Sequence, residues 1–459
     1  MEFLSSQKGQ PSSQEQQPSL RRRVAIIGAG YCGLCALRHF LSDPKYEATA
    51  FELSHQVGGV WNYPQRCEER TNEQMTSPFY TRMYRNMRTN LPKDLMALEG
   101  FSFLGGESSY IDASTVLQYL QSYADHFKLH PHIKLDHRVN VVTPILSEHV
   151  PANAVGPRWL VEYEDFKRNL TVTEIFDVVF VCNGKNHTPF VPEFFGLANF
   201  QGQRLHSSDY REPGRFAGQN VLLLGGGPSA GDIALDLISS AKTVILAKRQ
   251  PMSFFKDQFP NLKETAIPQG FTAHGAILED GSTADIDAVI LCTGFAYDFP
   301  FLSKECRVEA SRGRVTPLYR HLINAWYPTM AIPFVVTLVT LTPILDGQVK
   351  FFKAVLDGKV RLPSTEKMLQ LTEDDYRQRI VGNEEGGSRN IAHGMEQEIW
   401  AYLEEMGREA GFDAVEPVYP KMCAAAFHVL RTEFTTFKRD FIQRVDSESF
   451  WHVKKAEPN

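Results

Sequence analysis

The apolar positions of this chain fall into short continuous runs separated by helical patterns, the alternation that is typical of an α/β fold. Two runs, Val24–Ile27 and Val221–Leu224, are wholly apolar, and each opens onto a cluster of glycines. Such runs indicate strands buried on both faces of a parallel sheet. Apolar residues then resume at helical spacing, as at Ile233, Ala234 and Leu237. The pattern therefore predicts two strand–turn–helix units.

The same pattern predicts further elements. Strands are expected at Ala48–Phe51, Val139–Val141, Trp159–Tyr163, Phe176–Val181, Thr243–Ala247 and within Asp287–Tyr297. Helices are expected at Ser114–Phe127, from Ala230 to about Ser239, at Val349–Leu356, and, within a largely polar helical C-terminal region, at Trp400–Met406 and Phe434–Phe441.

The repeated unit suggests two Rossmann-like dinucleotide-binding domains, with the smaller inserted in the larger. We expect the first part of the larger domain at 21–205, the inserted domain at 206–297, and the return part with a helical C-terminal region at 298–459. Residues 1–20 are rich in Ser, Gln and Pro, which predicts a disordered tail.

Composition narrows the class of protein. With 43% apolar and 22% charged residues the chain is typical of a soluble protein, and its net charge of −6 argues against nucleic-acid binding. Its seven cysteines lack metal-ligand spacing, so we expect no metal site, and reduced thiols in the cytoplasm. The most apolar stretch, Met330–Leu345, is interrupted by Pro333 and Pro343 and is too short for a membrane anchor.

The first glycine cluster has the spacing of a phosphate-binding turn. Gly28, Gly30 and Gly33 lie between a predicted strand and a predicted helix, whose N-terminal N–H groups can hold a pyrophosphate. Glu52 ends the next strand, where a carboxylate can accept hydrogen bonds from both ribose hydroxyls. The first turn therefore favours FAD.

The second cluster, Gly225-Gly226-Gly227-Pro228-Ser229-Ala230, repeats this arrangement with one difference. Lys248 and Arg249 stand where the first unit has Glu52, and cations suit the 2′-phosphate of NADPH rather than the free ribose of NADH. The alternative is a solvated pair of cations at a strand end. We expect NADPH here, bound in part by Arg249.

Two further segments have a functional and a structural interpretation. In Gly58-Gly59-Val60-Trp61, adjacent glycines allow the backbone to approach a ring system, or only form a turn beside a buried Trp. In Thr89-Asn90-Leu91-Pro92, Asn90 can donate and accept hydrogen bonds beside the cofactor, or only form a turn.

Taken together these residues resemble the flavin-containing monooxygenases, which are class B flavoproteins. Residues 22–360 carry the resemblance well, and the C-terminal hundred residues carry it loosely. It rests on the first glycine turn with Glu52, the Gly58–Trp61 element, the Thr89–Lys93 turn, and the family signature FxGxxxHxxxY at Phe200, Gly202, His206 and Tyr210. The absence of a membrane tail is similar to the compact insect members, among them pyrrolizidine-alkaloid N-oxygenases.

The resemblance implies an oxidoreductase that uses FAD, NADPH and O2 to oxidise a soft nitrogen or sulfur atom through a flavin C4a-hydroperoxide, with a role in detoxification. It implies that Asn90 is catalytic, that Val139 offers its backbone to the adenine, and that Gln348 contacts the flavin. His206 and Tyr210 either link the domains structurally, which is the favoured interpretation, or take part directly in the chemistry. The residues expected to bind the cofactors are Gly28, Ala29, Gly30, Tyr31, Cys32, Gly33, Glu52, Gly59, Val60, Trp61, Asn90, Val139, Gly225, Gly227, Pro228, Ser229, Ala230, Arg249, Thr293 and Gln348.

Three alternatives stay open. A Baeyer–Villiger monooxygenase would keep the fold and act on ketones, although related enzymes of that kind usually carry Trp where this chain has Tyr210. A pyridine nucleotide:disulfide oxidoreductase would need a CxxC beside the flavin, whereas the CxxC of this chain, Cys32 to Cys35, lies in the first phosphate turn and its helix. A non-catalytic FAD/NADPH sensor is the third. The expected partners are a small amine or sulfide, and a second copy of the chain in a homo-oligomer.

Overall fold

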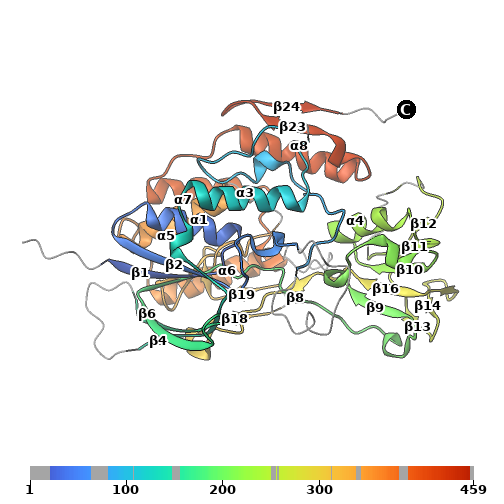
Figure 1. Cartoon of the computed structure of the whole chain (residues 1–459), viewed down its shortest axis with the longest axis horizontal. Helices are drawn as coiled ribbons and strands as arrows, with labels where there is room; N and C mark the ends of the chain where they lie inside the picture. The colour runs from blue at the N-terminus through green and yellow to red at the C-terminus, as the bar shows by residue number, and fades with distance from the viewer. Residues whose placement is uncertain are drawn as a thin grey trace, which may run out of the picture.

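The computed structural model describes residues 21–63, 81–106, 108–146, 156–249, 255, 258–311, 313–337, 343–381 and 391–454. It shows two α/β units (Figure 1) joined by two short antiparallel strands, β8 (Thr188–Pro189) and β17 (Phe295–Ala296). The predicted tail at 1–20 lies outside the described residues, as does Cys67.

The larger unit is built on a seven-stranded sheet of order β20-β21-β22-β7-β1-β2-β3. The five strands from β22 to β3 run parallel, which is the Rossmann-like arrangement that the sequence predicted. The strands are β1 (Arg22–Ile27), β2 (Tyr46–Glu52), β3 (Ile133–Leu135), β7 (Val178–Val181), β20 (Leu318–Tyr319), β21 (Ile323–Asn324) and β22 (Met330–Ala331).

Side chains that alternate along β1 divide the core of this unit into two layers. Val24 and Ile26 pack with the helices α1 (Tyr31–Leu41), α3 (Ala113–His126) and α5 (Ile344–Leu356). Ala25 and Ile27 pack with an antiparallel sheet of β4 (His137–Ile145), β5 (Arg158–Asp165) and β6 (Leu170–Phe176). Both faces are covered, which explains why the strand is wholly apolar.

The smaller unit repeats this design. Its five-stranded parallel sheet has the order β12-β11-β10-β16-β9, with α4 (Pro228–Leu237) on one face. A three-stranded antiparallel sheet packs on the other face. The strands are β9 (Gln203–His206), β10 (Asn220–Leu224), β11 (Thr243–Ala247), β12 (Leu262–Thr265), β16 (Ala288–Leu291), and, in the antiparallel sheet, β13 (Gly270–Phe271), β14 (Gly275–Ile277) and β15 (Thr283–Asp285).

The boundary expected between 205 and 206 falls inside β9, all four residues of which pair with β16 of the smaller sheet. The chain passes between the units at β8 and again at β17. We therefore propose that the inserted domain begins after β8 and ends before β17. The local pattern could not show this, because a short edge strand gives no apolar run of its own.

The C-terminal region contains α6 (Thr365–Val381), α7 (Glu398–Ala410) and α8 (Val418–Thr432), and then the hairpin of β23 (Phe441–Arg444) and β24 (Phe450–Val453). The helix predicted at Phe434–Phe441 is wrong: a 3-10 turn at Phe437–Arg439 leads into β23. Its aromatic residues Phe434 and Phe437 are buried in the core around α4 instead of forming a helical stripe.

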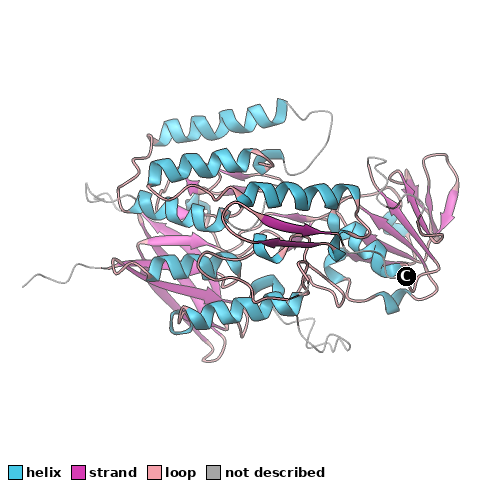
Figure 2. Ribbon diagram, turned by 90° about the horizontal axis from the view of Figure 1, so that it is seen from above, coloured by secondary structure: helices cyan, strands magenta, loops and turns pink. Residues whose placement is uncertain are grey.

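This C-terminal segment bridges the two units. Met422 and Val429 of α8 share a core with Ala230 and Ile233 of α4, and Ser109 of the larger unit exchanges hydrogen bonds with the backbone of Ile442. In Figure 1, α8 lies above α3 in the view, next to the hairpin of β23 and β24, and Figure 2 shows the strands of the larger and the smaller unit gathered at opposite ends of the molecule. The C-terminal segment therefore contacts both units, and the assignment of 298–459 to the larger domain stays a prediction.

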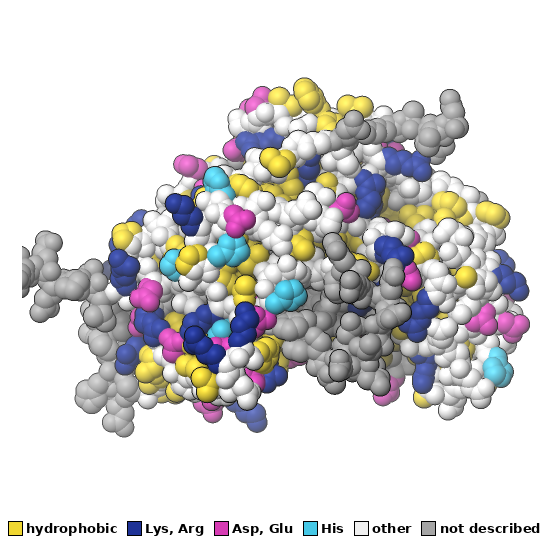
Figure 3. All heavy atoms as spheres, viewed as in Figure 1, with side chains coloured by type: hydrophobic (Ala, Val, Ile, Leu, Met, Phe, Trp, Pro, Cys, Tyr) yellow, Lys and Arg dark blue, Asp and Glu magenta, His cyan; other side chains and the backbone are white. Residues whose placement is uncertain are grey.

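The remaining elements are short. Strands β18 (Glu309–Ala310) and β19 (Val315–Thr316) form a hairpin. The 3-10 helices are Gly59–Trp61, Lys93–Leu95, His130–His132, Leu197–Asn199, Ser207–Asp209, Pro213–Phe216, Lys304–Cys306, Ile391–His393 and Phe437–Arg439. No helix in the described ranges is both long and apolar enough to span a membrane. Acidic and basic side chains are interspersed over the face shown in Figure 3.

Candidate functional site

The first phosphate turn is fixed by backbone packing that admits only glycine. Gly28 has φ of +105°, and a Cβ there would lie 2.5 Å from the carbonyl oxygen of Cys182. A Cβ on Gly33 would lie 1.8 Å from the carbonyl oxygen of Gly28. The helix α1 then begins without a side-chain cap, so its first N–H groups are available to an anion.

The Gly58–Trp61 element packs against the backbone of this turn, and its predicted approach to a ring system stays a prediction. The N–H of Gly58 donates to the carbonyl oxygen of Ala29 at 3.0 Å, and a Cβ on Gly30 would lie 3.4 Å from the Cα of Gly59. Trp61 packs edge to face on Tyr31, with ring centroids 6.5 Å apart. Five predicted cofactor residues therefore form one surface.

Glu52 reaches the same turn from the end of β2. It is buried, and its Oε2 accepts a hydrogen bond of 2.7 Å from the N–H of Ala29, while Ser54 donates to its Oε1 through both its N–H and its hydroxyl. Ser54 was not predicted. Oε1 accepts two hydrogen bonds and Oε2 accepts one, so Oε2 keeps a lone pair with which Glu52 can bind a ribose hydroxyl.

Two polar side chains at this site have atoms without a partner. The Oδ1 of Asn90 and the hydroxyl of Tyr31 are both buried and accept or donate no hydrogen bond within the described part of the chain. Burial raises the pKa of Tyr31 well above its usual value, so this hydroxyl stays protonated and can donate a hydrogen bond to a ligand. Buried polar atoms are rarely left unpaired, so these atoms fit a polar ligand such as FAD.

Asn90 is held in place by its neighbours. Thr89 donates its N–H to the carbonyl oxygen of Ile111 at 2.8 Å and accepts the N–H of Ile111 on its hydroxyl at 3.1 Å. Lys93 donates its N–H to Ser109 at 2.7 Å. The backbone of the turn is therefore fixed on both sides of Asn90.

Val139 and Gln348 are less simply placed. Val139 lies on β4 beside a bulge in its pairing with β5, where backbone groups are freed for other partners. Gln348 is fully buried, and its amide is committed to protein groups: it accepts the N–H of Phe334 and donates to the hydroxyl of Tyr402, both at 2.9 Å. In this structure Gln348 positions Phe334, and its contact with flavin stays a prediction.

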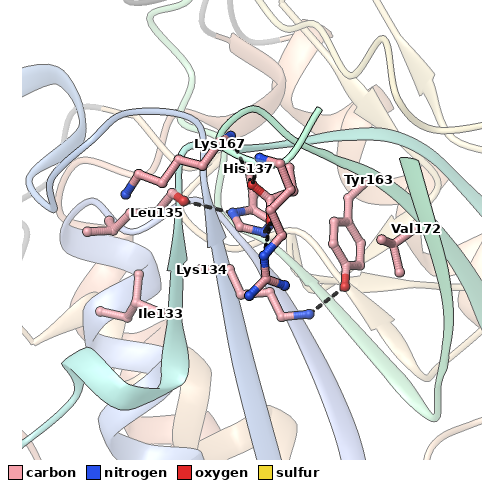
Figure 4. A pocket seen from close by; sticks show the side chains of 9 residues that line it. Ile133, Lys134, Leu135, His137, Tyr163, Lys167 and Val172 are labelled. Atoms are coloured by element: carbon pink, nitrogen blue, oxygen red, sulfur yellow. Dashed lines mark hydrogen bonds and ion pairs between the residues drawn. The ribbon is translucent and has the colours of Figure 1, made fainter. Parts of the chain in front are cut away.

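A cavity of about 470 Å³ lies beside the edge strand β3 (Figure 4). This strand pairs with the end of β2, where Glu52 is opposite Leu135. His137 donates from Nδ1 to the carbonyl oxygen of Leu135 there, and Lys134 contacts Tyr163. The lining consists of Ile133, Lys134, Leu135, His137, Tyr163, Asp165, Lys167, Arg168 and Val172. No predicted cofactor residue belongs to this lining, so the cavity is not assigned to the cofactor.

The second glycine turn has the same physical origin as the first. Gly225 has φ of +148°, and a Cβ there would lie 2.2 Å from the carbonyl oxygen of Cys292. Gly227 precedes α4, Pro228 is its first residue, and Ala230 is buried under the helix. Ser229 is exposed. The turn therefore presents a helix N-terminus to solvent, as a dinucleotide site requires.

The two cations that follow β11 differ. Lys248 is buried and forms an ion pair with Glu264 of the neighbouring strand β12. Arg249 is exposed beyond the end of the strand. Lys248 is therefore a structural residue. Arg249 is the exposed one of the two cations, and its contact with a 2′-phosphate stays a prediction.

The FxGxxxHxxxY signature links elements rather than lining a cavity. The Nδ1 of His206 accepts the N–H of Ser208 at 3.1 Å, so Nε2 carries the proton and donates to the carbonyl oxygen of Gly294 at 3.0 Å. Burial lowers the pKa of His206, which keeps the ring neutral. Tyr210 donates its hydroxyl to Asp236 of α4 at 2.6 Å. These contacts give both residues structural roles within the smaller unit, and a link between the domains through them stays a prediction.

Thr293 precedes Gly294, the residue that accepts the hydrogen bond from His206, and lies just before β17, where the chain returns to the larger unit. Its hydroxyl donates to the carbonyl oxygen of Phe190, which fixes the two linkers to each other. Its contact with a cofactor stays a prediction.

Sequence reasoning missed the contacts that fix one nucleotide unit against the other. Asn86 donates to Asp236 at 2.8 Å, and Tyr84 donates to Asp232 at 3.4 Å, so the segment that leads to Asn90 is tied to α4. Lys438 forms an ion pair of 2.7 Å with the same Asp232. No local sequence pattern predicts these contacts, because the two partners of each contact lie more than a hundred residues apart in the chain.

Comparison with known proteins agrees with this geometry. The family model "Flavin-binding monooxygenase-like" matches residues 21–258 and 262–416. Senecionine N-oxygenase of Tyria jacobaeae is 30% identical over 449 residues, covering 95% of this chain and 93% of that protein. Flavin-containing monooxygenase FMO GS-OX-like 4 of Arabidopsis thaliana is 31% identical over 367 residues, covering 77% and 80%. The structure of S-allyl-L-cysteine S-oxygenase from Allium sativum matches with a TM-score of 0.80 at 26% identity, covering 91% and 95%.

Proposed function

The chain belongs to the flavin-binding monooxygenase-like family, and we propose that it N-oxygenates tertiary amines of the pyrrolizidine-alkaloid class. It is an FAD-dependent monooxygenase that uses NADPH. When bound, FAD that has been reduced by NADPH supplies an activated oxygen atom to the substrate. The observation that carries the choice of substrate is the similarity to senecionine N-oxygenase, which extends over 95% of this chain.

The residues of the chain have three tasks in this proposal. The Gly28–Gly33 and Gly225–Ala230 turns bind the two pyrophosphates at helix N-termini. The contacts of Tyr84 and Asn86 with α4 hold the two nucleotide units in register, so that the two reacting rings can meet. Asn90 lies in a turn with a fixed backbone and offers a buried Oδ1 that can accept a hydrogen bond from a cofactor. None of these tasks needs a protein nucleophile.

Product analysis separates the alternatives. The FAD-bound enzyme is supplied with NADPH, O2 and, in separate reactions, a tertiary pyrrolizidine amine, a thioether and a cyclic ketone. We expect the N-oxide of the amine as the main product. A sulfoxide as the main product would show that the preferred substrate is a thioether instead of an amine. A lactone would indicate a Baeyer–Villiger enzyme. NADPH consumption without any product would indicate a sensor. Cytoplasmic location and self-association stay predictions.

A further inference from the structure

Lys185 is a half-buried lysine without an acidic partner among the residues that the structure describes. Its Nζ donates to the carbonyl oxygen of Val336 at 2.6 Å and lies 4.2 Å from the centre of the Phe334 ring. Burial lowers the pKa of Lys185 to about 8, although the nearby Cys32 raises it. A carbonyl oxygen and an aromatic ring leave the charge of this ammonium group uncompensated, so the site can take a negative charge that none of the described residues supplies.

The order of the sheet places Lys185 relative to a bound dinucleotide. In β22-β7-β1-β2-β3, the phosphate turn follows β1 and Glu52 ends β2, on one side of that turn. With its ribose at Glu52 and its pyrophosphate at the turn, FAD would extend its other half over the ends of β7 and β22. Lys185 follows β7, and Phe334 and Val336 follow β22. Lys185 therefore connects the loop that follows β7 with the loop that follows β22, on the side of the sheet where the flavin would lie.

The segment that Lys185 contacts is itself fixed. The N–H of Phe334 donates to Gln348 at 2.9 Å, and the carbonyl oxygen of Val335 accepts the hydroxyl of Tyr297 at 2.6 Å. The carbonyl of Val336 belongs to this segment. The ammonium group of Lys185, which donates to that carbonyl, is therefore held in a defined position.

We propose that Lys185 supplies the positive charge that stabilises reduced, anionic FAD in this enzyme. Hydride transfer oxidises NADPH to NADP⁺ and adds two electrons and one proton to FAD, so a neutral ring becomes a monoanion without a proton from solvent. A fixed cation lowers the free energy of that state and leaves the oxidised state little changed. The proposal rests on FAD as the cofactor and is independent of the substrate.

Two measurements on the FAD-bound enzyme without substrate test this role. Sulfite adds to oxidised flavin and gives an anionic adduct, so its dissociation constant reports the local positive charge. We expect Lys185→Met to weaken sulfite binding tenfold or more. The two-electron midpoint potential should fall in parallel, by about 30 mV for each tenfold change. Lys185→Arg keeps the charge and should restore both values toward those of the wild type.

Lys353 provides a matched control, because it is also half-buried. It lies near the C-terminal end of α5, where it pairs with Asp43 and donates to the carbonyl oxygen of His39. Lys353→Met should change neither value. An unchanged sulfite affinity and potential in Lys185→Met would overturn the proposal, as would failure of Lys185→Arg to restore them. Weaker FAD binding with an unchanged potential would assign Lys185 to the pyrophosphate and would also overturn it. Because no amine is present, these results stand apart from the substrate proposal.

Discussion

Replacement of Arg249 by Ala should convert a preference for NADPH into near equality between the two nicotinamide cofactors. Lys248 is buried and paired with Glu264, so Arg249 is the cation at the end of β11 that a 2′-phosphate can reach. A charge-assisted hydrogen bond contributes about 2 kcal/mol, from a range of about 1.5–3 kcal/mol. That energy corresponds to a loss of ~30-fold in NADPH affinity.

NADH has no 2′-phosphate, so its affinity should change little in Arg249→Ala. The assay is anaerobic reduction of the bound flavin in a stopped-flow instrument, with the dissociation constant for each cofactor taken from the concentration dependence of the rate. Lys248→Met is the matched control: it removes the buried ion pair with Glu264 and should lower thermal stability, while the ratio of NADPH to NADH affinity is preserved. Equal losses for both cofactors in Arg249→Ala would refute the assignment of the 2′-phosphate site.

The other predictions concern single residues of the two turns and the domain contacts. Asn90→Ala should keep FAD but release more hydrogen peroxide per NADPH, measured with a peroxidase-coupled assay; an unchanged product yield per NADPH would end the catalytic assignment. Gly33→Ala should purify without flavin, because its Cβ would lie 1.8 Å from the carbonyl oxygen of Gly28; wild-type FAD content would show that the turn is not the FAD site. Tyr210→Phe loses a 2.6 Å bond to Asp236 and should cost about 1.5–3 kcal/mol of stability with little change in kcat; a large fall in kcat at unchanged stability would instead give this residue a chemical role.

The glycine turns could be predicted from the sequence because their cause is local. A strand, a glycine with positive φ and a helix lie within about ten residues of each other, and the packing at Gly28 and Gly225 has the same form in both units. The buried strand Val221–Leu224 was predicted for the same reason and lies within β10. Local backbone requirements of this kind are visible in the order of residues.

The parts that depend on distant contacts could not be predicted. The spacing of Phe434 and Phe437 resembles an amphipathic helix, but both residues fill the core around α4, and the chain then enters β23. The roles of Asn86 and Lys438 depend on carboxylates of α4 that are far away in sequence. Lys185 gave no signal at all, because its environment is made by a loop after another strand. Long-range pairing decided each of these cases.

The central claim is that FAD and NADPH are bound by the two glycine turns so that one reduces the other. The absorbance spectrum of the purified protein tests this most directly. The protein should be yellow, NADPH should bleach the flavin bands without oxygen, and oxygen should restore them. A colourless protein that takes up no FAD on reconstitution, or a yellow one whose spectrum NADPH leaves unchanged, would contradict the account.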